Sequence, residues 1–153
     1  MDVERKILQE QHYLYVDRQC EYGPKIGEAM GSAFGEVFTF NAQHGIAPIS
    51  MPMTVYLEMD PRILRFRSGF LVTAEDAAKA SGNVNAATLP AGDVMTTIHV
   101  GPYDCMNETH KALWQLMEAE GIACAMPIWE IYVDDPERVE PSKVRTEIYR
   151  KVG

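Results

Sequence analysis

The chain has 153 residues, 46% of them hydrophobic and 24% charged, which is the size and composition of one globular domain with its own core. Its formal net charge is −8, and no apolar run reaches the roughly 20 residues that span a bilayer. We therefore expect a cytoplasmic protein with no membrane partner. The acidic charge also argues against nucleic acid as a partner, because nucleic-acid binders carry a basic face.

In chain order, the first half reads as a strand, a helix and two more strands. Residues 12–20 are rich in aromatic and β-branched side chains, which predicts a strand. Residues 25–44 carry apolar side chains at the i, i+3, i+4, i+7 spacing of an amphipathic helix. Residues 53–59 and 62–72 predict the second and third strands.

The second half repeats that order after a connection. Residues 73–92 are small and polar, so we expect a surface connection there. Residues 93–100 predict a strand, and Asp104 can cap a helix with apolar positions through Met117. Residues 127–133 predict a buried strand, and residues 143–152 predict the last one.

The two halves form an internal repeat, which is visible in recurring short motifs of the sequence. Recurring pairs are Gly23-Pro24 with Gly101-Pro102, Gly45-Ile46-Ala47 with Gly121-Ile122-Ala123, and Tyr56 with Tyr132. We predict an α+β fold of two fused βαββ modules, about 12–72 and 93–152, in one domain over residues 1–153. A pseudo-twofold axis would relate the modules, with antiparallel sheets covered by helices on one side and a central ligand groove.

A carboxylate, Glu130, lies in the middle of the apolar strand at 127–133. Strand alternation puts Glu130 and Tyr132 on one face and Trp129 and Ile131 on the other. The Trp129 set is apolar, so we expect that face to pack under a helix. The Glu130 face would then be the uncovered one that lines the groove.

Several short motifs of the second half form a recognisable set. They are His99-Val100-Gly101-Pro102-Tyr103, Leu113-Trp114, Gly121-Ile122, Trp129-Glu130-Ile131-Tyr132, Asp135-Pro136 and Arg145-Thr146-Glu147-Ile148-Tyr149. Together they resemble the GyrI-like family, which includes the effector-binding domains of AraC-type and MerR-type multidrug regulators. The resemblance covers about 89–152, and more loosely about 13–72. It implies two fused βαββ modules around a groove that holds lipophilic aromatic cations against a buried glutamate, here Glu130.

A buried carboxylate is costly unless it is protonated or meets a positive partner, and an organic cation can be that partner. Aromatic rings add cation–π attraction, and methionines suit a pocket that accepts varied ligands. We predict that ligands meet Glu130, Tyr132, Tyr56, Tyr103, Glu147, Tyr149, Met51 and Met53. The alternative is structural: Glu130 pairs with Arg145 or another internal group, and the tyrosines and methionines fill the core or rim.

The function that we expect is binding of amphipathic, cationic aromatic compounds by a standalone domain, for sequestration or sensing. One alternative, known among standalone relatives, is hydrolysis of strained, cyclopropane-type molecules, with Glu130 as general base and Tyr132 as proton donor. A second is a protein-interaction inhibitor of DNA gyrase. No cofactor or metal site is predicted, because the four histidines lack ligand spacing. Cys105 and His110 lack an orienting third group, so neither is given a role, and a homodimer is left open.

Overall fold

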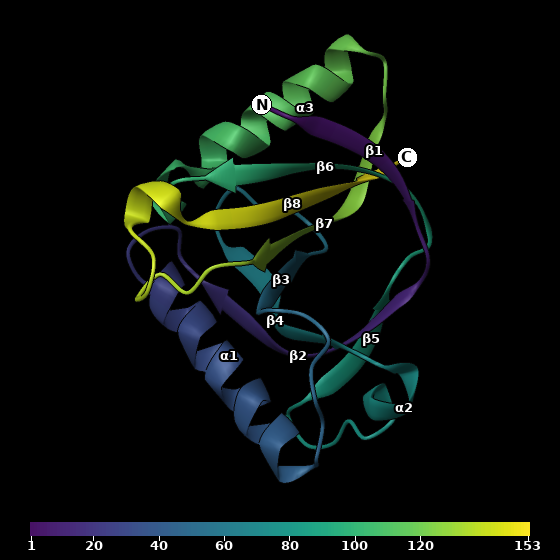
Figure 1. Cartoon of the computed structure of the whole chain (residues 1–153), viewed down its shortest axis with the longest axis vertical. Coiled ribbons are helices and arrows are strands. Elements are labelled where there is room, and N and C mark those ends of the chain that lie inside the picture. The colour runs from purple at the N-terminus through teal and green to yellow at the C-terminus, as the bar shows by residue number, and fades with distance from the viewer.

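The computed structural model describes all 153 residues as one eight-stranded antiparallel sheet with two long helices (Figure 1). The strands are β1 (Val3–Leu8), β2 (Gln11–Cys20), β3 (Met53–Tyr56), β4 (Leu64–Val72), β5 (Asn85–Leu89), β6 (Gly92–Val100), β7 (Cys124–Tyr132) and β8 (Arg145–Val152). The helices are α1 (Ile26–Gln43), the short α2 (Ala74–Ala77) and α3 (Met106–Ala119), with 3₁₀ turns η1 (Tyr103–Cys105) and η2 (Pro141–Lys143). No helix is both long and apolar enough to cross a membrane.

Each half of the chain contributes three central strands and one long helix. Across the sheet the strands run β1-β6-β8-β7-β3-β4-β2-β5. The first module therefore has the order β3-β4-β2 and the second has the matching order β7-β8-β6. The halves join where β3 pairs with β7, with Thr54 directly opposite Glu130. The predicted α+β fold is confirmed, and the pseudo-twofold axis stays a prediction.

The connection at 73–92 carries more structure than its composition predicts. It contains α2 and β5, and β5 pairs with β2 at the end of the sheet. The apolar side chains of Ala77, Val84 and Leu89 are buried there. Small residues are sufficient at this position because an edge strand has only one neighbour to pack beside.

Both long helices cover the same face of the sheet. Directly paired residues share a face, and Val16, Ser68, Thr54, Glu130 and Ile148 form one row across five strands. Val16 packs under α1, and Ile148 packs under α3. Glu130 lies between Thr54 and Ile148 in this row, so it is on the helix-covered face.

The expectation that the Trp129 face lies under a helix is therefore wrong. Trp129 packs with side chains from other strands of the same sheet, among them Tyr13, Met53 and Leu89. In Figure 1 β1 lies near the top of the sheet and β5 near the bottom. Alternation shows which residues share a face, but it does not show which face the helices cover.

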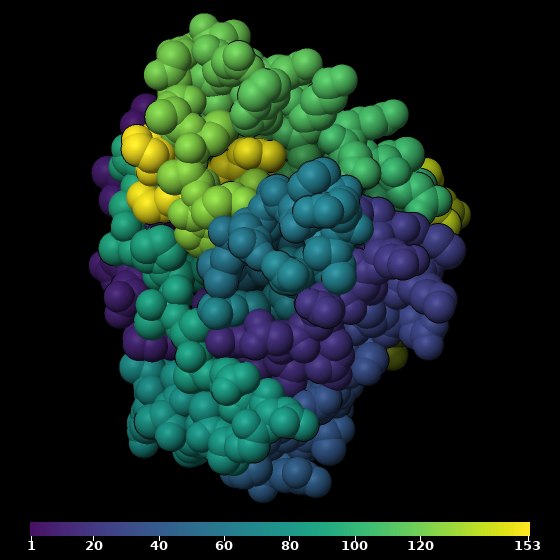
Figure 2. Space-filling view, turned by 180° about the vertical axis from the view of Figure 1, so that it is seen from behind, coloured from purple at the N-terminus to yellow at the C-terminus, as the bar shows by residue number.

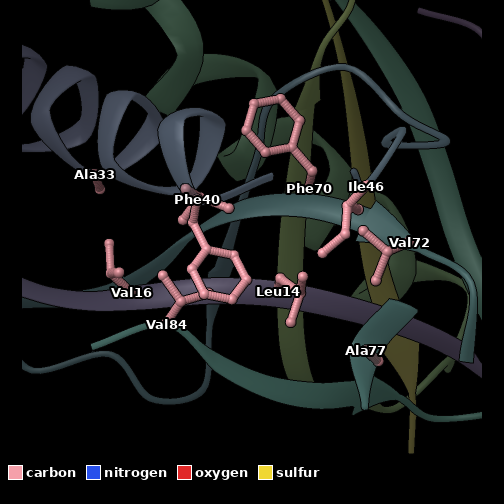
Figure 3. Packing of buried hydrophobic residues seen from close by; sticks show 10 residues of the cluster. Leu14, Val16, Ala33, Phe40, Ile46, Phe70, Val72, Ala77 and Val84 are labelled. Carbon is pink, nitrogen blue, oxygen red and sulfur yellow. The ribbon is translucent and has the colours of Figure 1, made fainter. Parts of the chain in front are cut away.

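The core under α1 fixes that helix on the first module. Leu14 and Val16 of β2 meet Ala33 and Phe40 of α1 in one buried cluster. Figure 3 shows Phe40 pointing from the helix toward Leu14 and Val84. Burying each large side chain of this kind stabilises the fold by roughly 1.5–3 kcal/mol. The position of α1 over the sheet is thus set mainly by apolar packing.

The segment between β3 and β4, residues 57–63, lies on the face of the molecule seen in Figure 2. In Figure 2 this segment lies between elements of the second half and the beginning of the α1 region. The Tyr22 hydroxyl donates to the Asp60 carbonyl oxygen over 2.6 Å and so ties the segment to the residues before α1.

Candidate functional site

Glu130 occupies the seam between the two modules. It is only 5% exposed and lies on the face that α1 and α3 cover. The pairing of β7 with β3 brings Tyr56 of the first module beside it, and Tyr132 follows two residues later on the same face. A single carboxylate is thus enclosed by elements from both halves of the chain.

Three side chains hold the two carboxylate oxygens of Glu130. The Tyr132 hydroxyl donates to Oε1 over 2.7 Å, and the Tyr56 hydroxyl approaches the same atom at 3.4 Å. His110 of α3 places its Nε2 2.5 Å from Oε2, and its side chain is 17% exposed. Burial of an ionised carboxylate requires such partners, because its lost hydration must be replaced.

The phenols beside Glu130 stay protonated over the ordinary pH range. Burial raises the pKa of Tyr132 and of Tyr56 well above the usual value, and the negative charge of Glu130 raises each pKa further. Both hydroxyls are therefore neutral donors to the carboxylate. They stabilise its ionised form without carrying a positive charge.

Aromatic and sulfur-containing side chains surround the carboxylate. Met30 of α1 brings its sulfur 3.7 Å from the Tyr132 hydroxyl oxygen and 3.9 Å from Thr54 Oγ1. Phe34 of α1 meets the Tyr132 ring edge-on, with centroids 5.7 Å apart, and Tyr103 does the same from η1 at 5.7 Å. Tyr103 is 41% exposed, so it lies at the surface above the buried Tyr132. We define the Glu130 site as Glu130, His110, Tyr56, Tyr132, Met30, Phe34 and Tyr103.

Four of the eight ligand residues predicted from the sequence meet at this site: Glu130, Tyr132, Tyr56 and Tyr103. The pairing of β3 with β7 and the alternation along each strand bring Tyr56, Glu130 and Tyr132 to one face, and Tyr103 meets Tyr132 from η1. The ligand role of each stays a prediction.

The other four predicted residues lie elsewhere. Glu147, Tyr149 and Met53 are on the opposite face, because Ile148 rather than its neighbours shares the face of Glu130. Met51 precedes β3 and is exposed. The register of β8, which the sequence leaves open, decides this separation.

Sequence reasoning missed His110, Met30 and Phe34. On α3, His110 falls in the buried stripe of Met106, Leu113 and Met117, at positions i, i+4, i+7 and i+11 of one helix face. A histidine within an apolar stripe is the signal that identifies it. An ion pair between Glu130 and Arg145, the alternative expected from the sequence, is not formed. Arg145 pairs instead with Asp134, whose carboxylate is 2.9 Å away.

Two hollows of the surface lie away from this site. One of about 570 Å³ runs between α1 and residues 81–84, and one of about 360 Å³ lies around Asp17 and Arg65. Neither is lined by a residue of the Glu130 site. No three His, Cys, Asp or Glu side chains gather as a metal ion would require.

A family model of the GyrI-like small molecule binding domain matches residues 1–152. The chain belongs to this family. The resemblance read from its motifs is thereby confirmed, and the chain is a small-molecule-binding domain. None of the curated proteins compared with the chain matches it.

Solved structures share the GyrI-like fold at low sequence identity. The EcmrR C-terminal domain is 19% identical with a TM-score of 0.73, and the match covers 99% of this chain and 97% of that one. SAV2435 bound to tetraphenylphosphonium is 12% identical with a TM-score of 0.67, covering 100% and 94%. A hydrolase from Listeria innocua is 20% identical with a TM-score of 0.66, covering 99% and 91%. At these identities the likeness shows the fold.

Proposed function

We propose that this GyrI-like domain binds lipophilic aromatic cations at the Glu130 site. The observation that carries the proposal is a carboxylate 5% exposed among aromatic rings, with two neutral phenols and one imidazole as its partners. A bound cation would neutralise the carboxylate charge where water is excluded. Coulomb attraction between the carboxylate and a cation is stronger there than in water, and a lipophilic cation loses little hydration when it enters.

The aromatic side chains supply the remainder of the recognition. The rings of Tyr132, Phe34 and Tyr103 meet edge to face, so their faces and edges point in several directions around the carboxylate. Each good contact between a cation and a ring face contributes about 0.5–2 kcal/mol. Such a wall favours flat or propeller-shaped aromatic cations over small inorganic ones.

A ligand reaches Glu130 only if side chains of the site move. Met30 lies against Tyr132 and Thr54, and Phe34 lies against Tyr132. A methionine has three rotatable bonds and repacks easily, which suits a site that accepts ligands of different shape. The exposed Tyr103 marks the side from which a ligand would enter.

Two further observations agree with a cationic ligand. The net charge of −8 attracts cations from solution toward the molecule. SAV2435, which shares the fold, has been solved with tetraphenylphosphonium, a lipophilic aromatic cation. EcmrR, whose C-terminal domain shares the fold, has also been solved in a complex with DNA. A domain that senses small molecules would be consistent with such a regulator.

The test is equilibrium binding of tetraphenylphosphonium to the wild type, to Glu130→Gln and to Glu147→Gln. We expect Glu130→Gln to lose about 1–3 kcal/mol of binding free energy, because the ion pair with the ligand is gone. Glu147→Gln, which alters an acid on the opposite face, should bind as the wild type does. Equal binding by all three proteins would contradict the proposal. Mass spectrometry of the recovered ligand should show it unchanged.

Hydrolysis is the second candidate, and the contact between His110 and Glu130 favours it. A carboxylate that holds one imidazole nitrogen orients the ring, and the other nitrogen can then take a proton from water. The hydrolase from Listeria innocua shares the fold. A product whose mass is increased by one water, formed by the wild type and not by His110→Gln, would establish this activity in place of simple binding.

A further inference from the structure

We infer that His110 is a tethered countercharge for Glu130, which a cationic ligand replaces, so that binding of a permanent cation releases one proton. This inference rests on the function proposed above and makes His110 the residue that selects ligands by charge. A neutral ligand of the same shape would leave the imidazolium in place.

Both oxygens of Glu130 are already occupied within the protein. Tyr132 and Tyr56 reach Oε1, at 2.7 Å and 3.4 Å, and His110 reaches Oε2 at 2.5 Å. A separation of 2.5 Å between nitrogen and oxygen is short even for a charge-assisted hydrogen bond. An incoming cation must therefore approach a carboxylate that the imidazole already contacts.

Around this pair the other titratable groups are phenols. Tyr56 of β3, Tyr132 of β7 and Tyr103 of η1 have pKa values raised first by burial, so they stay neutral at pH 5–8. From α1 the site receives the uncharged Met30 and Phe34. Two further carboxylates, Asp135 and Asp134, act on Tyr103, and Asp134 is paired with Arg145. His110 is thus the one titratable base in contact with Glu130.

The proton balance follows from the two ring nitrogens of His110. In the empty site an imidazolium and a carboxylate carry opposite charges. When a cation enters, Nδ1 gives its proton to solvent and keeps the electron pair of the broken bond. Nε2 keeps its hydrogen and continues to donate to Glu130 Oε2. The site has no net charge before or after binding, because the ligand charge replaces the proton charge.

Linkage gives the sign of the pH dependence. The empty site holds one more proton than the occupied site, so a higher pH favours occupancy by a permanent cation. Affinity should rise with pH, by at most about tenfold per pH unit, and level off once the empty site has lost its proton as well. A neutral ligand should show the opposite tendency or none.

The experiment uses methyltriphenylphosphonium as the permanent cation and triphenylphosphine oxide as a neutral ligand of similar shape. Calorimetric titrations at pH 5–8, in buffers of different ionisation enthalpy, measure both affinity and protons released. The proteins are the wild type, His110→Gln and Glu130→Gln, with His12→Gln as a control in another part of the sheet. Glutamine at position 110 retains an N–H donor for Glu130 and cannot carry the proton.

We expect wild type and His12→Gln to release up to one proton per cation bound and none with the neutral ligand. His110→Gln should bind the cation with no pH dependence and at least as tightly as the wild type does at pH 5. If cation binding requires Glu130 but releases no proton, the role inferred for His110 is wrong, and the proposed function still holds. An equal pH dependence in His110→Gln would overturn that role as well. If the cation fails to bind, or binds equally to Glu130→Gln, the proposed function fails, and this inference fails with it.

Discussion

The molecule contains the same pair of residues twice, once on each face of the sheet. On the helix-covered face the Tyr132 hydroxyl donates to Glu130 Oε1 over 2.7 Å, and on the other face the Tyr149 hydroxyl donates to Glu147 Oε1 over 2.8 Å. In both pairs the tyrosine follows the glutamate by two residues along a strand. The direct contact between acid and phenol is thus nearly identical in the two places.

The surroundings of the two pairs differ. Glu147 and Tyr149 are half-buried, and Tyr149 stacks on Trp129 with ring planes 7° apart. Glu130 and Tyr132 are buried between α1 and α3, and Glu130 also contacts the imidazole of His110. A glutamate beside a tyrosine is therefore not in itself a binding site. Enclosure by helices from both modules, together with the imidazole of His110, distinguishes Glu130.

The largest effect that separates the two faces should be on stability. Trp129 is 1% exposed at the centre of the strand-packed face, so Trp129→Ala should lower the free energy of unfolding by about 3–5 kcal/mol. Tyr103→Ala, at the exposed edge of the Glu130 site, should cost less than about 1 kcal/mol. Chemical denaturation measures both. If Trp129→Ala were as stable as Tyr103→Ala, the Trp129 face would not be the more important of the two for stability.

The two phenols give the next largest contrast. Tyr132→Phe leaves a buried carboxylate oxygen without its shorter hydrogen bond and should cost about 1–3 kcal/mol of unfolding free energy. Tyr149→Phe removes a hydrogen bond to a half-buried acid and should cost less than about 1 kcal/mol. Denaturation curves at pH 7 compare them. Equal losses would mean that the enclosure of Glu130 has no energetic consequence.

Access to Glu130 should depend on α1. Met30→Ala removes the thioether that lies against Tyr132 and Thr54, so a cationic ligand should associate several-fold faster. The matched control is Met53→Ala, a buried methionine on the opposite face. Stopped-flow fluorescence with a rhodamine-type cation reports the association rate. An unchanged rate in Met30→Ala would place the entry route elsewhere.

The smallest effect should appear in alkaline solution. The raised pKa values of Tyr56 and Tyr132 mean that the folded protein keeps these protons above pH 10, where the unfolded chain releases them. The unfolded state then binds fewer protons, so stability falls as pH rises above about 10. Tyr56→Phe should show a shallower fall between pH 9 and 11 than the wild type does, in denaturation measured at each pH. A parallel fall would contradict the assignment of a raised pKa to this phenol.

Much of the fold could be predicted from the sequence, because the repeat and the strand and helix periods are local signals. The repeat makes Tyr56 and Tyr132 equivalent residues, and the pairing of β3 with β7 brings the two together on one face. Three features depend on tertiary packing. The face that the helices cover, the register of β8 that turns Glu147 away, and the contact of His110 with Glu130 arise only when elements distant in sequence meet.

The small and polar composition of residues 85–89 predicts a surface connection, but these residues form the edge strand β5, because small residues can form an edge strand as well as a loop. The histidine is the most instructive omission. His110 matches no nucleophile or metal motif, whereas its place in the buried stripe of α3 indicates an internal partner for the acid.

The most direct test of the central claim is a crystal structure of the complex with tetraphenylphosphonium. If Glu130 is the binding carboxylate, the phosphorus atom will lie between α1 and α3, within about 6 Å of the Glu130 carboxylate or of a ring of the site. Met30 and Phe34 will have moved relative to their positions here. A ligand bound instead beside Glu147 and Tyr149, with the Glu130 site still closed, would contradict the claim.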